Sequence, residues 1–230
     1  MNAKRMSWYV PAGVAAIATA GLLIANSAQG EHCKKGEHHA KYLDAEHAPT
    51  GDGWTSLIDH DSLKGWEQRH TDRPMSWTAS NGVLINFSSH DAHGTDIYTK
   101  EKFEDFEVYY EYLVAQRSNS GLYLRGRYEI QILDNRDEKP APHTDGGFYS
   151  VAAPATDASK GAMKWQSVYA KLVGKTVTVI HNGKTIHDKI ELPRPTGGHL
   201  DNDVDKPGPI MIQGDHGSLA VRNLHIRPIK

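Results

Sequence analysis

The chain has little cysteine, little net charge and no sustained helical patterning. Its single cysteine, Cys33, has no partner within the chain, so the fold depends on a hydrophobic core rather than on disulfides. The formal net charge is only −2, which argues against a nucleic-acid-binding protein with a basic surface. No segment after residue 50 keeps a 3.6-residue apolar period over three turns, and there is no internal repeat. The 230 residues therefore suffice for one sizeable domain and a leader.

The N-terminal segment has the order of a secretory signal. Two basic residues precede an apolar run from about Trp8 to Ala25, and small residues surround Ala28. The run is also close to the minimum length for crossing a bilayer, so residues 1–30 are predicted to be a signal peptide or an N-terminal membrane anchor. Both predict export, to the periplasm, the extracellular space or the outer face of the inner membrane. Membrane contact is expected only through this segment.

The rest of the chain divides into a linker and a β-rich body. Residues 31–50 are polar and rich in histidine, but the spacing matches no closed metal site, so a linker is predicted. Residues 51–230 show short apolar alternations separated by glycine, asparagine and aspartate. Asn-Gly pairs at 81–82 and 182–183 predict two-residue hairpin turns, and His181 beside the second is expected to be exposed. This domain is predicted to be an all-β sandwich or barrel.

The segment 119–134 has the most informative pattern. Read as one strand, it places apolar side chains on one face and polar ones on the other. Carboxylates, amides and guanidinium groups can hydrogen-bond sugar hydroxyls, and aromatic rings can cover the apolar face of a pyranose. The polar row therefore indicates a carbohydrate site, with a plain solvated face as the alternative. The row consists of Tyr123, Arg125, Arg127, Glu129 and Gln131.

Two carboxyls in this segment invite a closer comparison. Glu129 and Asp134 would face opposite ways on a regular strand, but a β-bulge between them would return both to one face. Glu129-x-Gln131-x-x-Asp134 then resembles the Glu-x-Asp-x-x-Glu arrangement of sandwich-fold retaining β-glucanases. Gln131 replaces the middle acid, which weakens the case for an ordinary retaining mechanism.

From about residue 53 to residue 229 the chain resembles the 3-keto-disaccharide hydrolases. The blocks that carry the resemblance lie at 53–59, 63–66, 103–108, 119–121 with 128–134, 165–166, 179–183, 208–213 with 216–217, and 221–224. The resemblance implies a concanavalin-A-like jelly roll of two packed antiparallel sheets. It also implies carbohydrate substrates with a ketone at C3, installed by a separate sugar 3-dehydrogenase.

A C3 ketone permits cleavage by elimination across C1–C2 followed by hydration, because the C2 proton is acidic and the C1 oxygen can leave. The site then needs a base, a stabiliser for the enolate oxygen and an acid. Glu129 or His216 would be the base. Arg125 or a bound divalent metal would stabilise the enolate, and Asp134 would be the acid or a metal ligand. The groups expected to bind the substrate are Asn119, Tyr123, Arg127, Gln131 and Gln213.

Two other functions fit the same pattern. A non-catalytic, lectin-like domain would bind sugar without turnover. A conventional retaining glycosidase would use Glu129 and Asp134 on unoxidised glycosides, with the two carboxyls about 5–5.5 Å apart in one cleft.

Overall fold

The computed structural model describes residues 49–51, 53–88, 93–135 and 138–230. The predicted leader and nearly all of the predicted linker lie outside these residues. The described residues form thirteen strands and no helix, so no helix in this part of the chain could cross a membrane. In chain order the strands are β1 (Thr55–Ser56), β2 (Trp66–Gln68), β3 (Trp77–Ser80), β4 (Val83–Asn86), β5 (Ile97–Thr99), β6 (Phe106–Val114), β7 (Asn119–Leu124), β8 (Tyr128–Leu133), β9 (Gln166–Val173), β10 (Thr176–His181), β11 (Lys184–Glu191), β12 (Met211–Ile212) and β13 (Leu219–Pro228).

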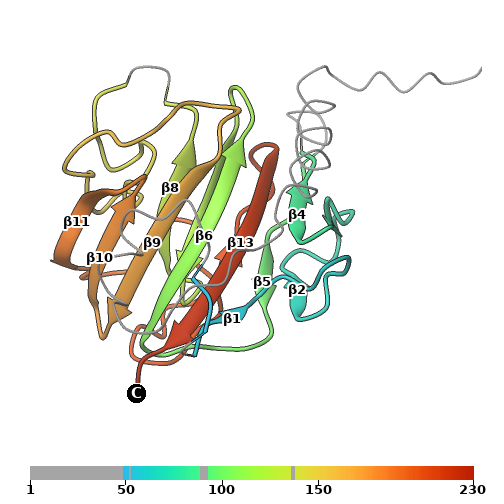
Figure 1. Ribbon diagram of the computed structural model, residues 1–230, viewed down its shortest axis with the longest axis horizontal. Coiled ribbons are helices and arrows are strands. Elements are labelled where there is room, and N and C mark those ends of the chain that lie inside the picture. The colour runs from blue at the N-terminus through green and yellow to red at the C-terminus, as the bar shows by residue number, and fades with distance from the viewer. Residues whose placement is uncertain (1–48, 52, 89–92, 136–137) are drawn as a thin grey trace, which may run out of the picture.

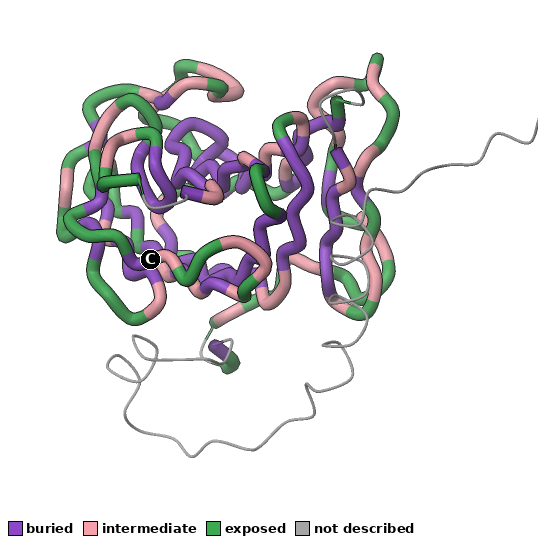
Figure 2. Tube along the Cα trace, turned by 90° about the horizontal axis from the view of Figure 1, so that it is seen from above, coloured by how far each residue is buried: buried purple, intermediate pink, exposed green. Residues whose placement is uncertain are grey.

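The strands form two antiparallel sheets around one core. The larger sheet has the order β11-β10-β9-β6-β13-β4-β3, with β1 paired to β13, and the smaller has the order β2-β5-β12-β7-β8. Figure 1 shows β11, β10, β9, β6 and β13 side by side from left to right. Buried side chains of both sheets meet in one hydrophobic cluster, as Val108 and Tyr110 of β6 do with Leu122 of β7 and Ile130 of β8. Figure 2 shows these buried stretches inside a rim of exposed loops. The expected jelly-roll sandwich is confirmed.

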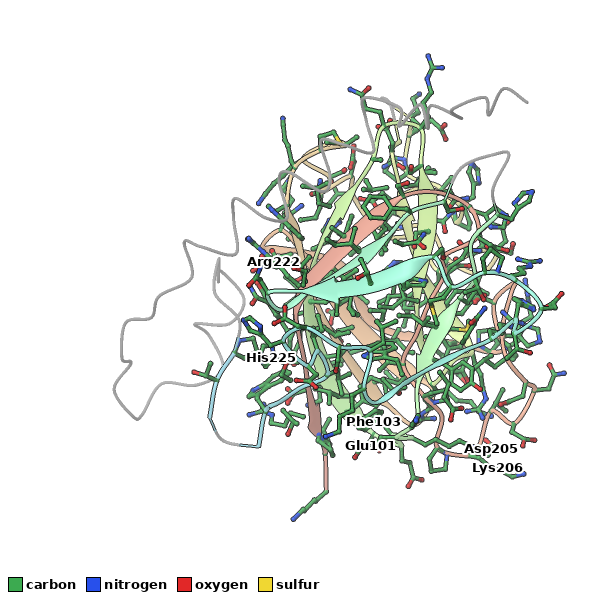
Figure 3. All side chains as sticks on the ribbon, turned by 90° about the vertical axis from the view of Figure 1, so that its right-hand side faces the viewer. Glu101, Phe103, Asp205, Lys206, Arg222 and His225 are labelled. Atoms are coloured by element: carbon green, nitrogen blue, oxygen red, sulfur yellow. The ribbon has the colours of Figure 1, made fainter. Side chains whose placement is uncertain are left out.

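The outer face of the larger sheet is covered by ion pairs rather than left open. Glu107 and Glu111 of β6 point away from the core, yet they are 4% and 3% exposed. Arg227 Nε donates to Glu107, and Arg222 Nε donates to Glu111, each at 2.6 Å. The Arg222 guanidinium also lies 4.1 Å from the centre of the Trp165 ring. These contacts tie β13 to β6 on the side of the molecule that Figure 3 marks with Arg222, away from the smaller sheet.

Both predicted Asn-Gly hairpin turns are present. Asn81 and Gly82 join β3 to β4 with φ angles of 51° and 76°, and Asn182 and Gly183 join β10 to β11 with 47° and 78°. The prediction for His181 was wrong, because this side chain is only 1% exposed. It points into the sandwich rather than out along the turn.

Segment 119–134 is a hairpin and not one strand. Arg125 and Gly126 have φ angles of 52° and 65° and turn the chain between β7 and β8. The β7–β8 register runs from Asn119 opposite Leu133 to Leu124 opposite Tyr128 without a shift, so the predicted β-bulge is absent. Asp134 follows directly after β8.

Candidate active site

Polar side chains gather on the face of the smaller sheet that points away from the core. Leu122, Ile130 and Ile212 enter the core, so their neighbours along each strand must face outward. The register then places Tyr123 opposite Glu129 and next to Met211. We call this surface the polar face, and it carries Arg69, Asp96, Asn119, Tyr123, Glu129, Gln131 and Gln213.

Glu129 is the central group of the polar face. It is 3% exposed, and burial raises its pKa to about 8, although the Tyr123 hydroxyl opposes this by hydrogen-bonding its carboxylate. The negative charge of Asp96 raises the pKa further. The side chain leans across Gly121 of β7, where an added Cβ would lie 2.2 Å from the Glu129 Oε1 atom. Glycine is therefore required at position 121 for the carboxyl to occupy this place.

Tyr123 lies on the polar face, as predicted, but its ring is only 1% exposed. Its hydroxyl is 3.1 Å from the carbonyl oxygen of Gly197 and hydrogen-bonds Glu129, and burial raises its pKa above the ordinary value. A buried ring cannot stack on a sugar. Tyr123 therefore supports Glu129 instead of providing an aromatic platform.

His216 is held by an ion-pair chain. Its Nδ1 lies 2.5 Å from one oxygen of Asp215, whose other oxygen is 3.3 Å from the guanidinium of Arg73. The hydrogen bond that His216 Nδ1–H donates to Asp215 raises the pKa of His216, and the charges of Asp215, Asp96 and Glu129 act in the same direction. Because Nδ1 is occupied, Nε2 is the nitrogen that can donate a proton to a substrate.

Asp96 and Arg69 form a second fixed pair on this face. The guanidinium lies 3.1 Å from one Asp96 oxygen, and the backbone N–H of Gly214 donates to the other at 3.0 Å. Arg69 also donates to the carbonyl oxygens of Gly198 and His199, at 2.6 and 3.0 Å. Arg69 thus ties the 197–199 segment to this face near Tyr123.

Three predicted amide residues lie on the same face as Glu129. Gln213 follows β12, and its backbone N–H donates to the carbonyl oxygen of Gly121 at 2.9 Å. The side-chain oxygens of Gln213 and Asn119 are buried and have no hydrogen-bond partner among the residues that the structure describes. Such atoms call for a ligand or a water molecule, since burying an unpaired acceptor is costly. Gln131 Nε2 donates to the carbonyl oxygen of His143 at 3.2 Å.

The structure does not bring Arg125, Arg127 or Asp134 to the polar face. Arg125 donates to the Glu104 carbonyl oxygen at 2.6 Å and pairs with a nearby aspartate. Arg127 pairs with an aspartate at 2.6 Å and donates to the carbonyl oxygen of Lys206, which lies at the edge of the molecule in Figure 3. They leave the row because the turn at 125–126 ends β7.

Asp134 accepts from the backbone N–H of Arg117 at 2.9 Å. With no bulge between them, Glu129 and Asp134 do not share a face, so the predicted pair for a retaining mechanism is not formed. Among the residues that the structure describes, no three His, Cys, Asp or Glu side chains gather closely enough to hold a metal ion. Asp134 therefore belongs to no such group within the described residues.

Three groups of the site were missed in the sequence: Arg69, Arg73 and Asp96. Asp215 adjoins the predicted His216, and an adjacent acid often orients a histidine. Arg69 and Asp96 are 27 residues apart and carry no local pattern.

Taken together, the fold and the site define a jelly-roll sandwich with acid–base groups on the outer face of its smaller sheet. Residues 53–227 match the 3-keto-alpha-glucoside-1,2-lyase-like domain, and the chain belongs to this family. The resemblance in the sequence is thereby confirmed.

Relatives agree with this placement. A 3-keto-disaccharide hydrolase of Bacteroides thetaiotaomicron is 31% identical over 93 residues, which are 38% of this chain and 31% of that protein, so the match spans under a third of that relative's length. A crystal structure from Parabacteroides distasonis, provisionally named a glycosyl hydrolase, is 27% identical, with a TM-score of 0.62 over 77% of this chain and 84% of that one. A second structure from that organism, 17% identical with a TM-score of 0.64 over 77% and 94% of the two chains, shares the fold.

Proposed function

We propose that this protein is a carbohydrate-active enzyme that cleaves 3-keto-glycosides by elimination across C1–C2 and subsequent hydration. The observation that carries the proposal is the buried Glu129 of the polar face, whose pKa is about 8, close to His216, which Asp215 holds through Nδ1. A base with a pKa near the working pH is well suited to remove a carbon-bound proton. Family membership supports the substrate class.

In the first step, the Glu129 carboxylate takes the C2 proton, and the electrons of the C–H bond form an enolate with the C3 ketone. The enolate then expels the C1 oxygen, which takes a proton from Nε2 of His216, and a C1=C2 double bond forms. The departing C1 oxygen gains negative charge on the side of Glu129 where the cations His216 and Arg69 lie, and these cations would stabilise it. Arg125 has no part in this step because it lies off the polar face.

In the second step, water adds to C1 while the protonated Glu129 returns a proton to C2. His216 in its neutral form accepts a proton from the attacking water. The sum is hydrolysis with both residues restored. Asn119 and Gln213 would accept hydrogen bonds from sugar hydroxyls through their unpaired oxygens.

The test compares one glucoside with its 3-keto derivative, using the full chain with and without a chelator. Release of the aglycone from the keto sugar alone supports the proposal. Loss of this activity in the presence of the chelator would add a bound metal to the proposed mechanism. Release from the unoxidised glucoside would favour a conventional glycosidase. Binding without release would leave a lectin-like domain.

The proposal has two wider consequences. The ketone must come from an oxidoreductase that acts on C3 of the sugar, so we propose that such a dehydrogenase supplies the substrate. We also propose that the leader exports the protein, which fractionation of cells expressing the full chain would test.

A further inference from the structure

The strand pairing of the polar face continues beyond β8 into an irregular edge segment, residues 145–149. The backbone N–H of Gly146 donates to the Gln131 carbonyl oxygen, and that of Gln131 donates to the Gly147 carbonyl oxygen, both at 2.8 Å. The N–H of Tyr149 donates to the Glu129 carbonyl oxygen at 3.3 Å. The edge segment thus acts as one more strand of the smaller sheet.

Alternation along the edge segment places Tyr149 on the polar face. Phe148 bridges Ile130 and is fully buried in the core, so its neighbour Tyr149 points to the opposite side. Paired strands lie about 4.8 Å apart, so the Tyr149 backbone lies roughly this distance from that of Glu129. Tyr149 is 37% exposed, whereas Tyr123 is buried. Tyr149 therefore offers an accessible aromatic ring directly beside the proposed base.

Hydrogen bonds to buried groups hold the edge segment in place. Asp145 is fully buried and accepts the Tyr112 hydroxyl at 2.6 Å and the Leu133 N–H at 3.1 Å. His187 Nε2 donates to the carbonyl oxygen of Gly146 at 2.8 Å. A ring carried by an anchored segment loses little conformational freedom when a ligand binds.

The ring itself is supported by Gly197. A Cβ added at this glycine would lie 3.0 Å from two atoms of the Tyr149 ring, so the ring packs closely against the glycine backbone. This contact covers part of the ring and leaves the rest accessible. Gly197 is also the residue whose carbonyl oxygen lies 3.1 Å from the Tyr123 hydroxyl, so one backbone position links both tyrosines.

We propose that Tyr149 binds the apolar ring face of the keto sugar itself, and not the leaving group; this rests on the proposed function. The order across the sheet is edge segment, β8, β7 and β12, and His216 follows β12. Tyr149 therefore lies on one side of Glu129, and the group that protonates the leaving oxygen lies on the other. With C2 at Glu129 and the C1 oxygen at His216, the remainder of the sugar ring extends toward Tyr149.

Binding measurements test this assignment without needing turnover. In the full chain carrying Glu129→Gln, calorimetry would measure the Kd of methyl and 4-nitrophenyl 3-keto-glucosides. Tyr149→Ala should weaken binding of both sugars equally, by about tenfold, because the lost contact is an aromatic stack. Tyr149→Phe should bind like the parent, and Tyr149→Leu should lose as much as Tyr149→Ala, since leucine has no planar face. Val173→Ala is the control. Val173 is a similarly exposed apolar residue at the end of β9 in the larger sheet, so its substitution should leave both Kd values unchanged.

Four results would overturn the proposal. Weakening only of the nitrophenyl sugar would assign Tyr149 to the leaving group. Parent-like binding by Tyr149→Leu would show that the side chain merely supports Gly197. Unchanged binding by Tyr149→Ala would remove the platform while leaving the proposed function intact, provided that Gln131→Ala still weakens binding. Absence of keto-sugar binding by the parent and by every variant would refute both proposals together.

Discussion

Replacing Glu129 by glutamine should stabilise the fold while removing the proposed base. The folded protein keeps the Glu129 proton up to a pKa of about 8, whereas an unfolded glutamate loses it near its ordinary value of 4.5. Between these values the unfolded state binds fewer protons, so the free energy of unfolding falls as the pH rises. At about 1.4 kcal/mol per pH unit, the ionisation of this group on unfolding lowers the free energy of unfolding at pH 7 by on the order of 3 kcal/mol. A glutamine has no proton to lose and escapes this cost.

Urea denaturation at pH 5, 7 and 9 would measure the effect. Glu129→Gln and the wild type should be nearly equal in stability at pH 5, and the variant should be more stable by a few kcal/mol at pH 7 and above. Glu101→Gln is the matched control, because Glu101 is exposed at the lower edge of the molecule in Figure 3. Glu129→Gln should also lower kcat on a 3-keto-glucoside by about 10²–10⁴-fold, the usual contribution of a general base. A stability difference that does not change with pH would refute the claim that burial holds the Glu129 proton.

Three further substitutions test other parts of the site. Asp215→Asn should lower the pKa of His216, shifting the alkaline limb of the kcat profile to lower pH and reducing kcat up to about 10²-fold; an unmoved limb would exclude His216 as the acid. Gly121→Ala should displace the Glu129 carboxyl and reduce kcat by roughly 10²-fold with little change in sugar Kd, whereas unimpaired turnover would show that Glu129 acts from another position. Asp145→Asn should reduce, but not abolish, the fall in unfolding free energy between about pH 4 and pH 7, because burial raises the pKa of Asp145 to about 7 while Glu129 still contributes its own part; denaturation of the variant and the wild type at both pH values checks this.

The fold could be predicted because its signals are local. The Asn-Gly pairs at 81–82 and 182–183 need only the positive φ angles that asparagine and glycine tolerate, and both form hairpin turns. Alternation within β8 correctly separated Ile130, in the core, from Glu129 and Gln131 on the polar face. The family blocks then supplied the sandwich architecture.

The errors in the site arose where the strand pattern did not record a change of direction. Arg125-Gly126 is a turn, but its arginine fits the polar alternation well enough to hide it. The alternation also continues smoothly through Gln131, so the sequence could not show whether a bulge precedes Asp134. Long-range pairs were out of reach for a different reason. The ion pair of Arg69 with Asp96 and that of Arg73 with Asp215 depend on which strands become neighbours, and no local spacing encodes this.

These pairs explain why Glu129 is the group most suited to exchange a proton. Asp96 has Arg69 as its partner, and Asp215 has Arg73 and His216, so each of these carboxylates is stabilised in its charged form by a cation. Glu129 has a neutral phenol as its hydrogen-bond partner and is more deeply buried than Asp215. Burial therefore makes its charged form unfavourable and moves its pKa to about 8, close to neutrality. A site that fixes two carboxylates and leaves the third able to gain and lose a proton has the division of labour that an acid–base reaction requires.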